Sequence, residues 1–396
     1  MPTPLRLVLG CISAAVAALL FLGRDQRIVA GWASENVRSF STSRIPSSGE
    51  TTDSSLGTKI LSNNDNDYKT KDEERPPLHT LIGDFDSNVT ADVEFLLDFA
   101  IIGHPKTATT STLRWLSLHD EIKMPRHEIH SLTHGKPAEF VSQMYSLPAG
   151  SKYKRGYKAP RDIERTRALD GIAEYFPSCK LVVGLRHPVL WFESFYNFLA
   201  RGGEDMPVGS LIGNCDAAGN NILCTDEARF HLHLNNLGKT NQTSAEEVKL
   251  LKPPLISETP TTKVQPMRNQ VFLYEISQLY DEDETRAYTY RRDLGNFIGL
   301  KRGLSPIAPA KHNRKNFKYA LDICEDQYRP LRKTLMNIAK PASEWIRSYF
   351  MQSPDVVVSS PEYFDSLLLD WMEDPCNQPR NGEGRRLSSI LDEYSE

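Results

Sequence analysis

Two apolar runs in the middle of the chain have the pattern of strands buried on both faces. Phe95–Ile102 is apolar except at Asp98, and Leu181–Leu185 is a second unbroken run. Neither run alternates between polar and apolar positions, as expected for a parallel sheet that is covered by helices on both sides. Both runs end at a turn that contains proline and leads into apolar residues at helical spacing. Gln270–Tyr274 predicts a third strand of the same kind.

These strands and the helical segments between them predict an α/β fold. The expected form is a P-loop-like three-layer sandwich, in which a central parallel sheet is flanked by helices. Residues 81–380 are predicted to be the folded part, which is a suitable length for one large domain. Tyr328–Ser353 has the spacing of a closing helix, and residues 381–396 form a polar tail.

The N-terminal segment, residues 1–23, is predicted to be a transmembrane signal anchor, with a cleavable signal peptide as the alternative. Residues 7–23 are apolar or small and are flanked by Arg6 and Arg24. As a helix they would span about 25 Å, near the roughly 30 Å of a bilayer core. Residues 24–80 are rich in polar side chains and predict a disordered stem. Either reading indicates the secretory route, and the anchor implies membrane contact through residues 7–23.

Charge and cysteine pattern narrow the possible partners. The formal net charge of −4, without an interleaved basic and aromatic platform, argues against nucleic acid. No cysteines and histidines have the spacing of a zinc site, so no metal is expected. The cysteines of the predicted domain suggest two disulfides, Cys215 with Cys224 and Cys324 with Cys376, and a free thiol at Cys179.

The residues after the first run predict a phosphate-binding loop. Gly103-His104-Pro105 forms a turn, Lys106 follows it, and the hydroxyl-rich stretch Thr107–Ser111 begins a helix. The first N–H groups of a helix have no intrahelical partner and lie at the positive end of its dipole, so they bind anions. A polar helix N-terminus without a ligand is the alternative. The common nucleotide loop G-x-x-x-x-G-K-[ST] has its lysine at the end, whereas here the lysine comes first.

The stretch PKTATTS resembles the 5′-phosphosulfate loop of sulfotransferases, PK-[TSA]-G-T-T-[ST], with Ala108 in place of the glycine. Alanine adopts positive φ less readily than glycine, so the loop either keeps negative φ at Ala108 or is strained there. The resemblance implies that the loop binds 3′-phosphoadenosine-5′-phosphosulfate (PAPS) as co-substrate, with Lys106 also catalytic. The implied contacts are Lys106, Thr107, Ala108, Thr109, Thr110 and Ser111.

A second anion-binding turn follows the second run. Arg186 ends that run and Ser194 lies about two helical turns beyond it. Arginine suits phosphate because its planar fork gives two parallel hydrogen bonds. The spacing resembles the 3′-phosphate motif of sulfotransferases, R-[DN]-P-x-x-[RW]-x-x-S-x-[YF], with His187 in place of the acid. The family also implies that a basic loop closes over this phosphate, which makes Lys311 and Arg314 candidate contacts; a plain basic loop is the alternative.

A candidate acid–base group lies between the two anion-binding turns. The segment HEIHSL resembles the K-E-x-H-F-F segment of glycan sulfotransferases, and it keeps Glu128 and His130. The resemblance makes Glu128 the first choice for the base that accepts the acceptor's proton, and His130 the second. A solvated charged loop is the alternative.

The basic stretch Lys152–Arg167 is predicted to be mostly a solvated helix face. Within it, Gly156–Pro160 resembles the short family strand that ends in K-[ST]-P. Lys158, together with Arg161, is therefore implied to bind the acceptor, for example a carboxylate or sulfate of an acidic glycan.

The resemblance covers most of Phe95–Met351 and implies a PAPS-dependent sulfotransferase of the Golgi carbohydrate type, heparan-sulfate-type enzymes included. Such an enzyme moves a sulfuryl group to a hydroxyl or amine of an acceptor glycan. It implies a single-pass Golgi membrane protein with a lumenal domain, in which Asn88 and Asn241 would be glycosylated; a secreted form is the alternative. Two other functions remain open: a catalytically inactive nucleotide- or glycan-binding descendant, and a P-loop kinase.

Overall fold

The computed structural model describes the central part of the chain. The described residues are 75–83, 88–201, 207–215, 223–238, 266–307 and 320–377. The predicted signal segment, the stem up to residue 74 and the polar tail therefore lie outside the described residues. Within the described part, none of the helices has both the length and the apolar character needed to cross a bilayer.

The core of the fold is a six-stranded sheet in the order β2-β3-β1-β4-β5-β6, and every strand pair in it is parallel. The carboxyl ends of its strands therefore all face one edge, where α/β proteins bind their ligands. The strands are β1 (Phe99–Ile101), β2 (Ile122–Lys123), β3 (Lys154–Lys158), β4 (Lys180–Leu185), β5 (Val271–Glu275) and β6 (Val356–Val358).

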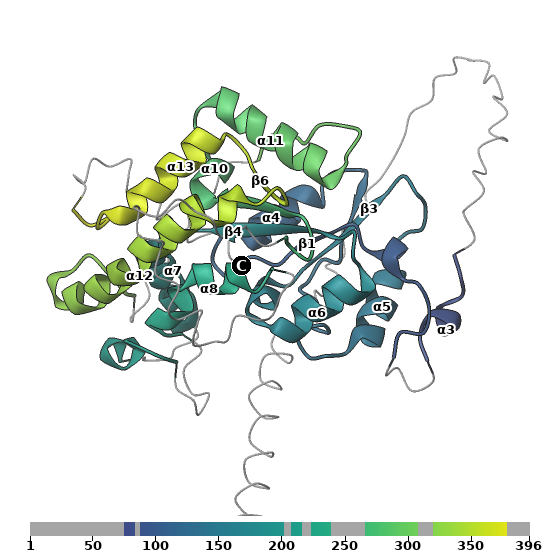
Figure 1. Ribbon diagram of the computed structural model, residues 1–396, viewed down its shortest axis with the longest axis horizontal. Helices are drawn as coiled ribbons and strands as arrows, with labels where there is room; N and C mark the ends of the chain where they lie inside the picture. The colour runs from purple at the N-terminus through teal and green to yellow at the C-terminus, as the bar shows by residue number, and fades with distance from the viewer. Residues whose placement is uncertain are drawn as a thin grey trace, which may run out of the picture. The chain divides into compact units, whose positions relative to one another are not determined.

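Helices cover both faces of this sheet (Figure 1). The larger helices are α4 (Thr109–Leu116), α5 (Pro137–Tyr145), α6 (Thr166–Tyr175), α7 (Pro188–Ala200), α11 (Glu284–Ile298), α12 (Arg329–Ser348) and α13 (Pro361–Leu369). Shorter pieces are α3 (Leu78–Leu81), η1 (Glu94–Leu96), η2 (Pro160–Glu164), η3 (Val208–Leu211), η4 (Thr225–Ala228), α8 (Phe230–Asn235), α10 (Ile276–Leu279), η5 (Asp326–Tyr328), η6 (Phe350–Gln352) and η7 (Asp370–Met372).

The core has two halves because successive strand residues point to opposite faces. In β4, Leu181 and Val183 join the cluster that contains α5, α6, α7 and α12, whereas Val182 joins the cluster that contains α4 and α11. The same alternation holds in β5, where Leu273 and Phe272 enter different clusters. The three-layer α/β sandwich expected from the apolar runs is therefore confirmed.

Two predicted element boundaries are wrong. The run Phe95–Ile102 forms a strand only from Phe99, because Asp98 accepts hydrogen bonds from the backbone of Arg155 at 2.8 Å and from Lys154 Nζ at 3.0 Å. The basic stretch Lys152–Arg167 is not a solvated helix face. It forms β3, η2 and the first residues of α6, and the guanidinium of Arg155 is buried on three backbone carbonyls.

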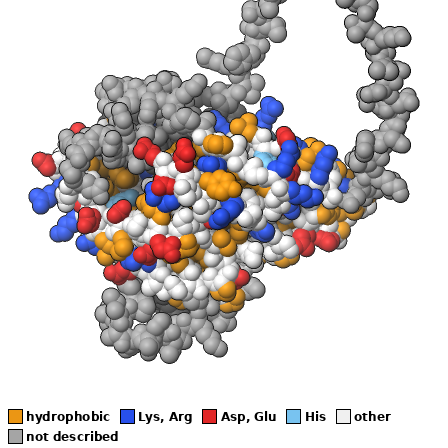
Figure 2. Space-filling model, turned by 90° about the horizontal axis from the view of Figure 1, so that it is seen from above, with side chains coloured by type: hydrophobic (Ala, Val, Ile, Leu, Met, Phe, Trp, Pro, Cys, Tyr) orange, Lys and Arg blue, Asp and Glu red, His pale blue; other side chains and the backbone are white. Residues whose placement is uncertain are grey.

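Both predicted disulfides are present. Cys215 is bonded to Cys224, and Cys324 is bonded to Cys376. Of the described cysteines, Cys179 is the free one, and it is buried before β4. On the face shown in Figure 2, acidic, basic and apolar side chains are interspersed, in agreement with the low net charge.

Candidate active site

The loop between β1 and α4 is held from beneath by side chains. Five consecutive carbonyls, those of residues 104–108, each accept a hydrogen bond from a side chain. In order, the donors are Thr107 Oγ1 at 2.7 Å, Trp191 Nε1 at 2.7 Å, Arg186 Nη1 at 3.4 Å, Tyr274 Oη at 2.9 Å and Thr112 Oγ1 at 3.1 Å. In a trans peptide the N–H points away from the C=O, so each amide from Lys106 to Thr109 points away from the bonded carbonyl of the residue before it.

The backbone of this loop is strained at two residues. Lys106 has φ 64° and Ala108 has φ 62°, and Ala108 is the residue that precedes α4. The structure thus settles the choice that the sequence left open, since Ala108 keeps the conformation for which the family uses glycine. A left-handed residue other than glycine costs about 1–2 kcal/mol. Left-handed residues in such a loop make a concave nest of N–H groups that binds anions.

Close approach of neighbouring strands keeps the loop in place. Gly184 of β4 lies directly beneath it, and a Cβ atom at Gly184 would come within 2.7 Å of both Thr107 Oγ1 and Tyr274 Oη. The ammonium of Lys106 is also held, because its Nζ lies 4.6 Å from the ring centroid of Phe198 on α7. Such a contact between a cation and an aromatic ring is favourable. The loop therefore presents a fixed positive charge beside its amides.

We expect Tyr274→Phe to destabilise the protein and to weaken anion binding at the loop. The change removes the donor to the buried carbonyl of Thr107, and an unsatisfied buried acceptor costs about 1–3 kcal/mol. Tyr290→Phe is the matched control, since its hydroxyl is buried without a hydrogen-bond partner among the described residues. Chemical unfolding should show a loss for Tyr274→Phe and no loss for Tyr290→Phe. Equal effects would contradict the anchoring role of Tyr274.

The predicted base lies next to this loop. Lys158 Nζ, at the end of β3, is 2.6 Å from Glu128 Oε1 and donates to Thr110 Oγ1 at 2.6 Å. His130 Nε2 lies 3.3 Å from the other carboxylate oxygen of Glu128. The pairing of β1 with β3 aligns Ile101 with Lys158, so the loop and this cluster leave the same edge of the sheet. Lys158 is only 3% exposed. It connects the predicted base Glu128 with Thr110, whereas the resemblance implies that it binds the acceptor.

The charges in this cluster keep Glu128 ionised. Burial raises the pKa of Glu128, but the hydrogen bond from His130 and the charge and hydrogen bond of Lys158 lower it to about 2. Burial also lowers the pKa of Lys158, against the attraction of Glu128. Glu128 is therefore a carboxylate at neutral pH, and a carboxylate is the form that accepts a proton.

Asp162, which the sequence gave no reason to select, supports the segment that carries Glu128. Its buried carboxyl accepts hydrogen bonds from Thr133 Oγ1 and from Tyr157 Oη, the latter at 2.7 Å. Burial raises the pKa of Asp162 to about 6 although both hydrogen bonds lower it. Asp162 thus ties the chain just after His130 to β3. The donors lie 29 and 5 residues away, so no local pattern could have revealed this link.

The second predicted anion-binding turn follows β4 and leads into α7. Arg186 follows β4, is 1% exposed and reaches the loop through the carbonyl of Lys106. Ser194, on α7, has a buried hydroxyl without a hydrogen-bond partner among the described residues. Buried hydroxyls normally have a partner, so this orphaned one fits a ligand site.

His187 explains how the motif keeps its structure without the family's acid. Its Nδ1 accepts a hydrogen bond from the backbone N–H of Val189 at 3.2 Å, which caps the N-terminus of α7. Asp or Asn usually supplies such a cap. Burial lowers the pKa of His187 to about 4, so the imidazole is neutral and can accept. The substitution preserves the cap without adding a negative charge beside Arg186.

One of the predicted contacts does not join the site. Arg161 pairs with Glu164 at 3.0 Å instead of extending the cluster at Lys158. Lys311 and Arg314 lie outside the described residues.

A second polar cluster lies behind the loop. His104 Nε2 is 3.1 Å from His233 Nδ1 on α8, and its Nδ1 donates to the carbonyl of Gly184 at 3.4 Å. Burial and the neighbouring His233 lower the pKa of His104 well below its usual value, so it is neutral. The charge of Glu227 acts on His233 in turn. The contacts of His104 with His233 and with the carbonyl of Gly184 also hold the turn before Lys106. From the sequence, His104 is only a histidine in a turn.

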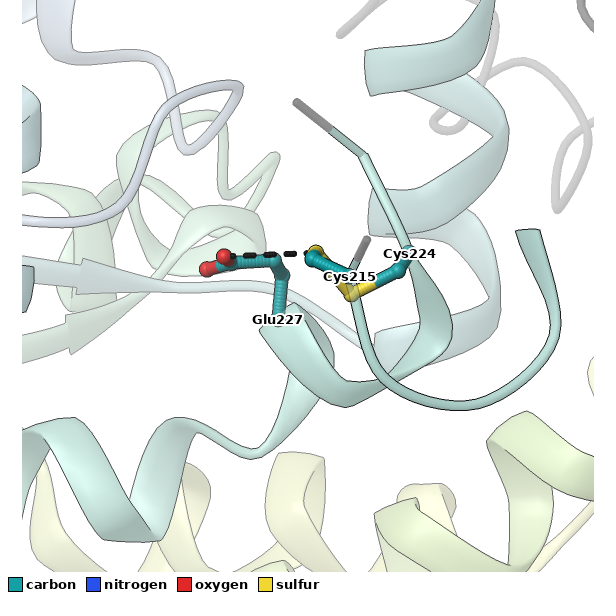
Figure 3. Close-up of side chains that lie close together, drawn as sticks. All are labelled: Cys215, Cys224 and Glu227. Atoms are coloured by element: carbon teal, nitrogen blue, oxygen red, sulfur yellow. Dashed lines mark hydrogen bonds between the residues drawn. A yellow bond between two sulfur atoms is a disulfide. The ribbon is translucent and has the colours of Figure 1, made fainter. Parts of the chain in front are cut away.

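Glu227 also contacts the disulfide between Cys215 and Cys224 (Figure 3). Its Oε1 lies 3.5 Å from Cys215 Sγ. A disulfide sulfur carries no hydrogen, so any hydrogen bond there needs the proton on Glu227. Burial and the nearby Glu164 raise the pKa of Glu227, which agrees with this. Among the described residues this group has the proximity of a metal site, but both sulfurs are already bonded to each other.

Comparisons with known proteins place the chain far from characterised relatives. No family model matches it, and no curated protein matches it. Among solved structures, the sulfotransferase from Alicyclobacillus acidocaldarius is similar, with 13% sequence identity and a TM-score of 0.42. That alignment covers 64% of this chain and 94% of the bacterial protein. A likeness of this degree carries no functional argument, so the function has to be argued from the site.

Proposed function

We propose that this chain is a PAPS-dependent sulfotransferase that moves a sulfuryl group to a hydroxyl or amine of a carbohydrate acceptor in the secretory pathway. One observation carries the proposal: the loop after β1 contacts both of the other candidate groups. It receives Arg186 on the carbonyl of Lys106 and Lys158 on the hydroxyl of Thr110. Two candidate anion-binding groups and a candidate carboxylate base thus meet around one strained loop, as transfer from an anionic donor to a protonated hydroxyl or amine would require.

The residues fit a nucleotide that carries a phosphate at both ends. The amides of the loop, with the hydroxyls of Thr109 and Thr110, would hold a 5′-phosphosulfate. Arg186 and the orphaned hydroxyl of Ser194 would hold a 3′-phosphate. When bound, PAPS supplies a sulfuryl group on a phosphate leaving group.

The chemistry assigned to the chain is one proton transfer and one stabilisation of charge. The carboxylate of Glu128 would accept the proton of the acceptor hydroxyl while the oxygen of that hydroxyl bonds to sulfur. The bond between sulfur and the phosphate oxygen breaks at the same time, and the ammonium of Lys106 and the loop amides stabilise the charge that the phosphate gains. Lys158, between Glu128 and Thr110, keeps the base and the loop in register.

The proposed location in the secretory pathway is supported by the sequence and by the disulfides. Residues 7–23 have the character of a membrane anchor, and the two disulfides are typical of an oxidising compartment. Asn88, in the sequon Asn-Val-Thr, is exposed and so is accessible for glycosylation. We therefore place the enzyme in the Golgi membrane with its catalytic domain in the lumen and an acceptor glycan as partner.

Calorimetry on the full chain in detergent tests the cofactor. Adenosine 3′,5′-bisphosphate, the desulfated product, should bind, and ATP with magnesium should not. Arg186→Ala should weaken bisphosphate binding about 100-fold, because a buried charge that pairs with a ligand contributes about 2–5 kcal/mol. Arg292→Ala, at an exposed arginine of α11, is the control and should bind like the wild type.

Other results would overturn the proposal. Binding of ATP with magnesium alone would favour a P-loop kinase. Binding of the bisphosphate without transfer from PAPS to any hydroxyl or amine acceptor would favour an inactive descendant.

A further inference from the structure

Glu275 is a buried carboxyl beside the candidate 3′-phosphate site, and the mechanism above does not use it. It is the last residue of β5, and the register of the sheet pairs it with Leu185, the last residue of β4. Arg186 follows directly. Glu275 is 4% exposed and Arg186 is 1% exposed, so solvent screens neither charge from the other.

Hydrogen bonds fix the position of this carboxyl. Its Oε2 accepts from the backbone N–H of Ser277 at 2.7 Å, at the start of α10. The backbone N–H of Glu275 donates to Gln278 Oε1 at 3.0 Å, which completes a capping box. The carboxyl therefore cannot turn away from the edge of the sheet when a ligand binds there.

The groups that face Glu275 come from four elements. Arg186, after β4, attracts its negative charge, and Asp370, in η7, repels it. Tyr363 of α13 and Tyr274 of β5 complete the surroundings. Burial raises the pKa of Glu275 to about 7, although the hydrogen bonds of Ser277 and the charge of Arg186 lower it. Glu275 thus exists in both protonation states near neutral pH.

An anion on Arg186 interacts differently with these two states. Ionised Glu275 repels the anion and neutralises part of the arginine's charge, whereas protonated Glu275 does neither. Coupling between two binding events is reciprocal, so the anion in turn favours the protonated form.

We propose that Glu275 is a positioning residue which acts through Arg186 and couples the binding of the nucleotide's phosphate to the uptake of one proton. This inference rests on the proposed function, in which Arg186 holds the 3′-phosphate. It gives the enzyme a cofactor affinity that rises as its surroundings become more acidic.

The test compares the wild type with Glu275→Gln over a range of pH. Glutamine keeps an oxygen for the N–H of Ser277 but cannot ionise. Calorimetry with adenosine 3′,5′-bisphosphate from pH 6 to pH 9 should show equal affinities at the acidic end. At the basic end the variant should bind more tightly, by about tenfold for each unit by which the bound anion raises the pKa of Glu275. A purely structural role would instead weaken the variant at every pH.

The phosphate groups of the ligand titrate as well, but identically for both proteins, so the ratio of the two affinities isolates Glu275. Glu362→Gln, at an exposed residue of α13, is the matched control and should follow the wild type. At pH 7.5, titrations in two buffers of different ionisation enthalpy should reveal proton uptake on binding by the wild type, and less by Glu275→Gln.

A readout without nucleotide keeps the two proposals distinguishable. The folded pKa of Glu275 lies above that of an unfolded glutamate, so the free energy of unfolding should fall as pH rises from about 4.5 to about 7. Glu275→Gln should lose this part of the pH dependence. Bisphosphate binding with the same pH dependence in both proteins would overturn the inference and leave the proposed function intact. Absence of binding at every pH, with the unfolding difference present, would contradict the proposed function and with it the inference.

Discussion

Lys106→Ala is expected to abolish sulfuryl transfer while the protein remains folded. The ammonium of Lys106 is the charge that stabilises the departing phosphate in the proposed mechanism, and removal of one such group costs about 10²–10³-fold in kcat. The backbone of the loop keeps its supports, because the carbonyl of residue 106 still accepts from Arg186. Alanine already occupies a similar left-handed conformation two residues later, at Ala108.

The measurement is transfer of labelled sulfate from PAPS to a pool of glycan acceptors, with circular dichroism to verify the fold. Lys152→Ala, at an exposed lysine before β3, is the control and should keep wild-type activity. Full activity of Lys106→Ala would exclude the proposed mechanism. Loss of the fold in Lys106→Ala would show that the side chain is needed for structure, against the argument from the backbone.

Glu128→Gln is expected to remove turnover, by about 10²–10⁴-fold, with little change in the affinity for adenosine 3′,5′-bisphosphate. The amide cannot accept the acceptor's proton, while the loop amides and Arg186 are untouched. Glu139→Gln removes a carboxylate from the neighbouring helix α5, where it pairs with Lys136, and should remain active. If His130→Ala is inactive and Glu128→Gln is active, the base is His130.

The pH dependence of the wild type gives a second check on Glu128. Its pKa of about 2 means that the carboxylate form is present across the whole range above about pH 4. The rate should therefore show no acidic limb from Glu128 between pH 5 and pH 8. The lowered pKa also means that the stabilisation by Lys158 and His130 is complete above the pKa of an unfolded glutamate, about 4.3, and is lost as pH falls through 2.

The sequence predicts those parts of the fold whose cause lies within a few consecutive residues. A strand covered on both faces is mostly apolar, which is why the apolar runs at β4 and β5 predict strands from the sequence alone. The turn after each run was also readable, since Lys106 and Arg186 follow the strands directly and parallel strands end at one edge. The roles of Glu128 and Lys158 are implied only by the resemblance to sulfotransferases. The structure shows that the two side chains contact each other, and their roles stay predictions.

The sequence was uninformative where a partner lies far along the chain. β3 contains three cations in five residues, which the strand tolerates because each has acceptors: Asp98 for Lys154, backbone carbonyls for Arg155, and Glu128 with Thr110 for Lys158. The supports of the phosphate loop are of the same kind, because Trp191 and Tyr274 lie 86 and 167 residues from the carbonyls that they bind. The role proposed for Glu275 likewise depends on Arg186, which follows the neighbouring strand β4.

One hydrogen bond that holds the loop after β1 comes from Tyr274, a residue made much later during synthesis of the chain. β1 lies inside the sheet, with β3 and then β2 on one side of it and β4, β5 and β6 on the other. The nascent chain emerges from its N-terminus, so Tyr274 becomes available only after β1, α4 and α7 have been made. Until β5 docks, the strained backbone at Lys106 and Ala108 lacks one of its supports. We therefore expect the loop after β1 to reach its final conformation late in folding. A chain that ends before β5 would contain the loop but lack the hydrogen bond from Tyr274 to the carbonyl of Thr107.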